Sequence, residues 1–265
     1  MDIQVLAHYR TLQEAPDYNG ALEALLAEHF GGEPWERLVR LSARHSFAQP
    51  GRPAPEPLLQ RLCASDLDRR AEDALRRLVA LLPPPRGPVR CHVLPSLTAA
   101  MGGCSYAPGK MLIALADKDV LESRLLRNVA HEYSHSVRLA LWPQDAAHGC
   151  GPAQPHSVRA YLVMEGLADA LADHLYPWDR PDARLPEALE PAYWDAIAPH
   201  LDETGSAAYV SWVVGEMPGL PSGAGYAAGT RLVRSFLRAS GTDAVAAQTL
   251  PWERVYWASA YAFAR

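Results

Sequence analysis

Cysteine is scarce in this chain, and its positions exclude two common roles. The 265 residues contain four cysteines, Cys63, Cys91, Cys104 and Cys150, and no two of them form a CxxC pair. Isolated cysteines argue against a disulfide-stapled secreted domain and against a cysteine zinc cluster. We therefore expect reduced thiols that act as small buried apolar side chains in a cytoplasmic protein.

Excess positive charge and long apolar runs are also missing. The 25 Lys and Arg residues are outnumbered by 30 Asp and Glu, the net charge is -5, and no basic block stands out. This balance argues against binding to nucleic acid or to an anionic membrane. No stretch approaches the roughly 18 apolar residues of a membrane span, and residues 1–15 lack the charged-then-apolar layout of a signal peptide.

Hydrophobic residues make up 49% of the chain, which is enough for a substantial core. Their spacing and the Pro and Gly breaks predict a mostly helical α+β fold. Two strands are expected around a glycine-containing segment, and they predict a small antiparallel sheet. The expected strands are residues 89–94 and 110–116; the expected helices are residues 21–30, 35–46, 67–82, 121–141, 157–175, 186–201, 224–240 and 252–262; the expected loops are residues 49–57 and 144–155.

The most informative segment is the HExxH motif His131-Glu132-Tyr133-Ser134-His135. A spacing of four places the two histidines one turn apart on the same helix face, so both can bind one metal ion. Glu132 lies further round the helix, where it reaches a water molecule on the metal rather than the metal itself. Catalytic zinc takes three protein ligands and keeps one position open. The motif therefore predicts one zinc ion per chain and requires a third ligand.

A carboxylate pair, Glu165 and Asp169, supplies the third ligand in our interpretation. The two residues are four apart in an otherwise apolar part of the helix expected at residues 157–175. Burial of such a pair is costly unless it meets a cation or hydrogen-bond donors. We assign Glu165 as the third ligand and Asp169 as the acceptor that fixes the tautomer of a ligand histidine. The alternative is a solvated acidic face on an ordinary helix.

Three other histidines, His148, His156 and His174, are rival third ligands. The HxxGxxH continuation that would supply a nearby third histidine is absent after His135. We therefore expect these three side chains to be exposed.

The chain resembles a known family in three segments, which are Asn128–His135, Met164–Asp169 and Gly225–Val233. The sequence is similar to the gluzincins, the thermolysin-like clan of metallopeptidases, and more narrowly to a bacterial family of unknown function described as zinc-dependent proteases. The resemblance covers roughly Pro88 to the C-terminus and implies a zincin-like catalytic domain. We expect this domain at residues 86–265, with its sheet packed on the HExxH helix, and a helical region at residues 1–85 before it. The usual family pattern has a tyrosine at the position of Thr230.

Peptide hydrolysis is the activity that this resemblance implies. Glu132 is expected to take a proton from a zinc-bound water and to pass it to the leaving amine. Tyr226, between Gly225 and Ala227, is the candidate donor to the oxyanion. Arg231 is a candidate for binding a substrate carboxylate, and the strand at residues 110–116 for pairing with an extended peptide.

Three other functions remain open from the sequence. The same residues suit a zinc hydrolase or tailoring enzyme that acts on a non-peptide or modified-peptide substrate. A non-catalytic protein whose zinc only joins two helices would not need Glu132. A metal-free helical binding protein would need none of the motif.

Overall fold

The structure is a computed structural model that describes residues 1–30, 55–96, 102–116, 122–142, 156–177, 186–215 and 221–261. The chain divides into two compact units. The first comprises Met1–Ala140 and His148–Pro152, and the second comprises Leu141–Ala147 and Ala153–Arg265. The helix expected at residues 35–46 and the loop expected at residues 144–155 lie outside the described residues.

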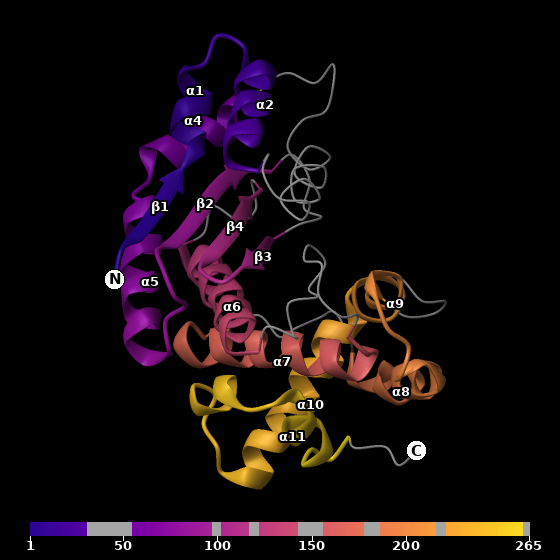
Figure 1. Cartoon of the computed structure of the whole chain (residues 1–265). Coiled ribbons are helices and arrows are strands. Elements are labelled where there is room, and N and C mark those ends of the chain that lie inside the picture. Colours follow the sequence, from indigo (N-terminus) through magenta and orange to yellow (C-terminus); the bar gives the residue numbers. More distant parts are fainter. Residues whose placement is uncertain are drawn as a thin grey trace. The chain divides into compact units, whose positions relative to one another are not determined.

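The first unit is built on a four-stranded mixed sheet in the order β1-β2-β4-β3 (Figure 1). β1 (Ile3–Ala7), β2 (Val89–Pro95) and β4 (Lys110–Leu115) are parallel, whereas β3 (Gly103–Ala107) is antiparallel to β4. The α+β class is confirmed. The predicted antiparallel pairing of the strands at residues 89–94 and 110–116 is wrong, because the glycine segment between them contains a strand, β3. The chain therefore reverses again at the turn before β4, and β4 runs parallel to β2.

Helices cover this sheet, and both faces of its inner strands β2 and β4 are largely buried. α5 (Leu67–Leu81) packs on β1, while α1 (His8–Glu14) packs on α4 (Glu56–Ala64), on α2 (Tyr18–His29) and on β2. The helices expected at residues 21–30 and 67–82 correspond to α2 and α5. The sequence did not lead us to expect β1, α1 or α4. The first residues of α4 fall in the loop predicted at residues 49–57.

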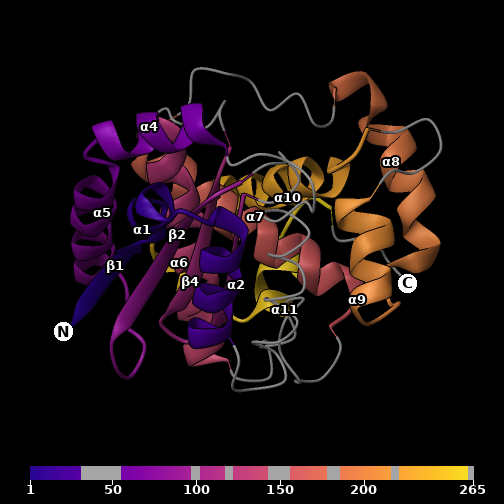
Figure 2. The ribbon, with the colours of Figure 1, turned by 90° about the horizontal axis from the view of Figure 1, so that it is seen from above.

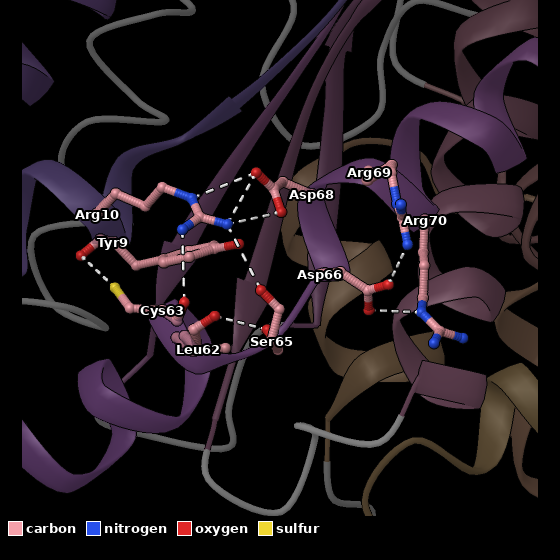
Figure 3. Close-up of polar contacts among 9 residues, drawn as sticks. All are labelled: Tyr9, Arg10, Leu62, Cys63, Ser65, Asp66, Asp68, Arg69 and Arg70. Atoms are coloured by element: carbon pink, nitrogen blue, oxygen red, sulfur yellow. Dashed lines mark hydrogen bonds and ion pairs between the residues drawn. The ribbon is translucent and has the colours of Figure 1, made fainter.

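Polar contacts of Arg10 connect α1 to α4 and α5 (Figure 3). Its guanidinium donates to both carboxylate oxygens of Asp68, at 2.9 and 3.1 Å, and to the carbonyl oxygen of Cys63 at 3.4 Å. Half-exposed ion pairs of this kind contribute about 0–1 kcal/mol, so they orient the helices more than they stabilise them. The division into a helical region at residues 1–85 and a catalytic domain at residues 86–265 stays a prediction.

The HExxH helix is α6 (Glu122–Leu141), and it lies against the sheet as expected. Ser105 on β3 donates its hydroxyl hydrogen to the carbonyl oxygen of Glu132. The backbone N–H of Gly109, in the turn between β3 and β4, donates to the Ser136 hydroxyl at 2.7 Å. These two bonds attach α6 to the β3–β4 hairpin over more than one helical turn.

The second unit is helical, and its centre is the contact between α7 (Val158–Leu175) and α10 (Ala224–Ser240), which lie side by side in Figures 1 and 2. Both match expected helices, and α11 (Trp252–Trp257) packs on α7. None of the helices in the described ranges has the length and apolarity to cross a membrane. The other helical elements are η3 (Glu187–Leu189), α8 (Glu190–Ile197), η4 (Ala198–His200), α9 (Ser206–Tyr209), η5 (Val210–Val214, a π-helix) and η6 (Ala246–Thr249).

Two glycines allow α7 and α10 to touch backbone to backbone. A Cβ atom on Gly166 would lie 2.2 Å from the carbonyl oxygen of Gly229, and one on Gly229 would lie 2.2 Å from the carbonyl oxygen of Leu162. Neither distance is tolerable, so only glycine fits at these two positions. The crossing fixes Glu165, the residue before Gly166, close to α10.

Candidate metal centre

The two histidines of the HExxH motif converge within the first unit. The Nε2 atoms of His131 and His135 lie 3.1 Å apart, and their ring centroids are 4.8 Å apart. His135 is buried and His131 is half-buried. Two imidazole nitrogens on a single helix face thus point to a common position, as the spacing of four predicts.

Glu132 is buried next to the hairpin that carries β3. A Cβ atom on Gly103 would lie 2.7 Å from Oε1 of Glu132 and 2.8 Å from its Cγ atom. A glycine in a strand often marks such a close approach, and here it leaves room for the carboxylate. Burial, with the charge of Glu132 nearby, raises the pKa of the Cys91 thiol to about 12. Cys91 is therefore an inert buried thiol, as expected for the cysteines, whereas Cys63 and Cys104 are half-buried.

In the second unit, Glu165 ends a chain of phenol hydroxyls. Tyr209 donates its hydroxyl hydrogen to Oε1 of Glu165 at 2.8 Å, and the hydroxyls of Tyr209 and Tyr226 are 2.8 Å apart. Because the single proton of Tyr209 is used on the carboxylate, Tyr226 is the donor in the second bond. Burial of the Tyr209 hydroxyl and the charge of Glu165 raise the pKa of Tyr209 well above its usual value, so this phenol stays protonated.

A π-helix and a glycine bring Tyr209 to Tyr226. Tyr209 ends α9, and the π-helical turn η5 follows directly. A Cβ atom on Gly225 would lie 2.4 Å from Cα of Val213 in this turn. Gly225 therefore allows the π-helix to pack directly against α10. Single π-turns are frequent at functional sites.

Asp169 is buried on the same face of α7 as Glu165. The Thr230 hydroxyl lies 3.1 Å from Oδ2 of Asp169 and 2.8 Å from the carbonyl oxygen of Tyr226, and its one proton serves one acceptor at a time. Thr230, which stands where the usual family pattern has a tyrosine, thus contacts Asp169, the residue that we predict to accept a hydrogen bond from a ligand histidine. The hydrogen bond from a ligand histidine to Asp169 stays a prediction.

Arg231 lies in a local ion pair. Its guanidinium donates to Oε2 of Glu190 at 2.6 Å, and Tyr261 donates to Oε1 of the same carboxylate at 2.8 Å. A substrate carboxylate would have to compete with Glu190 for this cation. The substrate-binding role of Arg231 therefore stays a prediction that these contacts do not favour.

The rival histidines differ in their surroundings. His174 is exposed, as predicted. His156 is buried with its ring edge-on to Tyr161 at a centroid distance of 5.8 Å, so the prediction that it is exposed is wrong. The contact with Tyr161 helps to remove this ring from solvent. His148 lies outside the described residues.

Peptide pairing with the strand at residues 110–116 is also wrong. β4 has β2 on one side and β3 on the other, so its backbone hydrogen-bonding groups are used within the sheet. In the described part of the chain, the strand that ends the sheet beside Glu132 is β3. We expected the segment that contains β3 to be only a connection between two strands, but β3 is the strand next to the HExxH motif.

The chain was compared with known protein families. A family described as predicted Zn-dependent protease (DUF2268) matches residues 89–256. The chain belongs to this family. The match runs from β2 to α11 and includes both the HExxH helix and the helix with Glu165. Comparison with the curated proteins and with the solved structures gives no match.

Sequence reasoning missed two residues that shape this centre. Gly103 carried a usable signal, since glycine within a strand pattern indicates a close contact. Tyr209 carried none, because the segment before η5 has no motif and the sequence cannot show that its hydroxyl meets Glu165. Both contacts arise from packing between elements far apart in the chain.

Proposed function

We propose that this protein is a single-zinc metallopeptidase in which His131, His135 and Glu165 hold the metal and Glu132 is the catalytic carboxylate. Each of the three offers a ligand atom of a type that zinc binds. The observation that carries the proposal is the convergence of the two histidine nitrogens beside a buried Glu132. The family match supports the proposal. We also propose that the protein acts in the cytoplasm.

The histidine pair fits the geometry of zinc. Zinc–nitrogen bonds of about 2.0–2.1 Å at tetrahedral angles place two ligand nitrogens about 3.3–3.4 Å apart. The observed separation of 3.1 Å needs only a small adjustment of either ring. The phenol of Tyr209 supports Glu165 as a ligand, because its hydrogen bond holds one carboxylate oxygen and orients the other.

Zinc supplies two kinds of chemistry when it is bound: it acidifies a water molecule and polarises a substrate carbonyl. Glu132 accepts the proton of the attacking water and then donates it to the leaving amine. Burial beside Gly103 keeps its carboxylate in a fixed position for both transfers. Tyr226 donates to the oxyanion, for which its hydroxyl must turn from Tyr209 to the substrate.

The strand next to Glu132 supports a peptide as the substrate. β3 is paired on one side by β4, and in the described residues it ends the sheet there. An extended peptide can add to such a strand through main-chain hydrogen bonds, with its carbonyl carbon placed near Glu132. A compact non-peptide substrate would have less use for this strand.

A substrate screen tests the proposal. The zinc-loaded protein should cleave members of a peptide library, as followed by mass spectrometry, and the cleavage should stop after chelation and resume with added zinc. Cleavage of simple esters or modified peptides alone would favour the hydrolase or tailoring alternative. A fully zinc-loaded protein that cleaves nothing in such screens would contradict the enzyme assignment.

Replacement of Tyr226 by Phe removes only a hydroxyl, so the packing of α10 should survive. We expect turnover to fall by about 100- to 1,000-fold, as for other lost oxyanion donors, with unchanged zinc content and a similar KM. Steady-state kinetics on a cleaved peptide measure both parameters. Full turnover in Tyr226→Phe would end this role.

Two neighbouring glycines offer a matched test of the position of Glu132. A Cβ atom on Gly103 would clash with Glu132, whereas one on Gly102 would lie 3.6 Å from its nearest neighbour, the Asn128 side chain. Gly103→Ala should therefore lower turnover by about 100-fold through misplacement of the carboxylate, with zinc retained. Gly102→Ala should retain most activity. Equal kinetics in the two variants would show that Glu132 tolerates the displacement.

A further inference from the structure

A second group of histidines lies in the first unit, away from the HExxH motif in the chain. It comprises His8 at the start of α1, His29 at the end of α2 and His92 on β2, and we call it the histidine trio. Nε2 of His8 and Nδ1 of His92 are 2.8 Å apart. His8 and His92 are buried, while the side chain of His29 is 28% exposed. Two helices and the sheet thus bring three imidazoles together.

The spacing of the trio matches that of a three-histidine metal site. Its ring centroids are 5.0 Å apart for His8 and His29, 5.1 Å for His8 and His92, and 5.1 Å for His29 and His92. A tetrahedral ion at about 2.0–2.1 Å from each nitrogen places neighbouring imidazole centroids about 5.2 Å apart. Each of the three separations lies close to this value.

Protonation in the trio favours metal binding. Burial, with the neighbouring histidines, lowers the pKa of His8 to about 4 and that of His92 to about 3. Both rings are neutral at pH 7, which is the state that a metal requires. Glu28 lies 3.8 Å from Nε2 of His29, and its carboxylate is exposed.

We propose that His8, His29 and His92 form a second metal site, which takes a divalent transition metal ion such as zinc. Imidazole donors suit zinc, copper and nickel. The proposal is independent of the proposed peptidase function, because it uses neither the HExxH helix nor Glu165. The partly exposed ring of His29 provides the way in for the ion.

Occupancy requires two small rearrangements. The ion replaces the hydrogen bond between His8 and His92, so the ring that donates this bond moves its proton to its other nitrogen, and no net proton is lost. No choice of one nitrogen from each ring places all three within 4.8 Å of one another. The ring of His29 therefore has to turn about its χ2 angle to present a nitrogen to the ion. The nitrogen and carbon edges of an imidazole have nearly the same shape, so such a turn changes the outline of the ring little.

Cobalt titration tests this site separately from the HExxH centre. The background is a His131→Ala/His135→Ala variant, in which two ligands of the proposed zinc centre are gone. We expect this protein to bind one equivalent of Co²⁺, with visible d–d absorption and paramagnetic shifts of the His8, His29 and His92 ring signals in NMR. Addition of His29→Ala to this background should weaken binding by at least about 100-fold, since two ligands rarely hold an ion tightly.

His174→Ala in the same background is the matched control, because this histidine is exposed on α7 in the other unit. Its cobalt affinity should not change. His29→Gln is a second test variant, in case Ala at this position disturbs α2; circular dichroism shows whether each variant is folded. The site does not exist if the background variant binds no cobalt, or if the His29 variants bind it as well as the control. Failure of the peptidase proposal would leave both measurements unaffected.

Discussion

The Glu132→Gln variant is expected to keep its zinc and its fold and to lose turnover by about 1,000- to 10,000-fold, the contribution of a positioned general base. The amide has almost the same size as the carboxylate, so the close contact beside Gly103 stays filled. It cannot accept a proton from the attacking water. The loss should therefore appear in kcat, with KM nearly unchanged.

A matched control separates this effect from a general change of charge. Glu56 is exposed on α4, and Glu56→Gln changes the net charge by the same amount. We expect this variant to have normal kinetics. Zinc analysis and circular dichroism on both proteins confirm that metal and fold are intact. Turnover of Glu132→Gln near the parent value on any hydrolysed substrate would remove Glu132 as the base.

Local patterns predicted the parts of this site that lie on single helices. The histidine pair depends on the period of one helix, and α6 brings the two Nε2 atoms to 3.1 Å as that period requires. Glu165 and Asp169 were likewise placed on one face of α7, where both are buried. The bounds of α10 agree with the expected helix at residues 224–240.

Features that depend on pairing between distant segments were not predictable in the same way. β1 is five residues long, and it is a strand because β2 pairs with it across more than 80 residues. We did not recognise β3 in its glycine-containing segment, and its antiparallel pairing with β4 makes β4 run parallel to β2. Tyr209 lies at the junction of α9 and the π-helix η5, and no local sequence pattern showed that its hydroxyl meets Glu165. Tertiary packing decided each of these features, and a single sequence does not specify it.

Loss of a zinc ligand should have a larger effect on the metal than loss of any neighbouring group. We expect His135→Ala to lose most of its zinc at the HExxH centre, because a ligand atom on the converging face of α6 is gone. Glu165→Ala should behave in the same way if the carboxylate held by Tyr209 is the third ligand. Zinc content after dialysis against a chelator, measured by elemental analysis, ranks the variants.

Asp169→Ala should fall between these variants and the parent. Loss of an outer hydrogen-bond acceptor typically costs about 10- to 100-fold in metal affinity or activity, not the whole site. Thr230→Val is a milder variant, because it keeps the shape of the side chain and removes only the hydroxyl near Oδ2 of Asp169. Its loss of metal affinity or activity should be smaller than that of Asp169→Ala. Equal and complete loss of zinc in Asp169→Ala and Glu165→Ala, with normal circular dichroism, would make Asp169 a ligand. Full retention of zinc in His135→Ala would overturn the assignment of the metal to the HExxH helix.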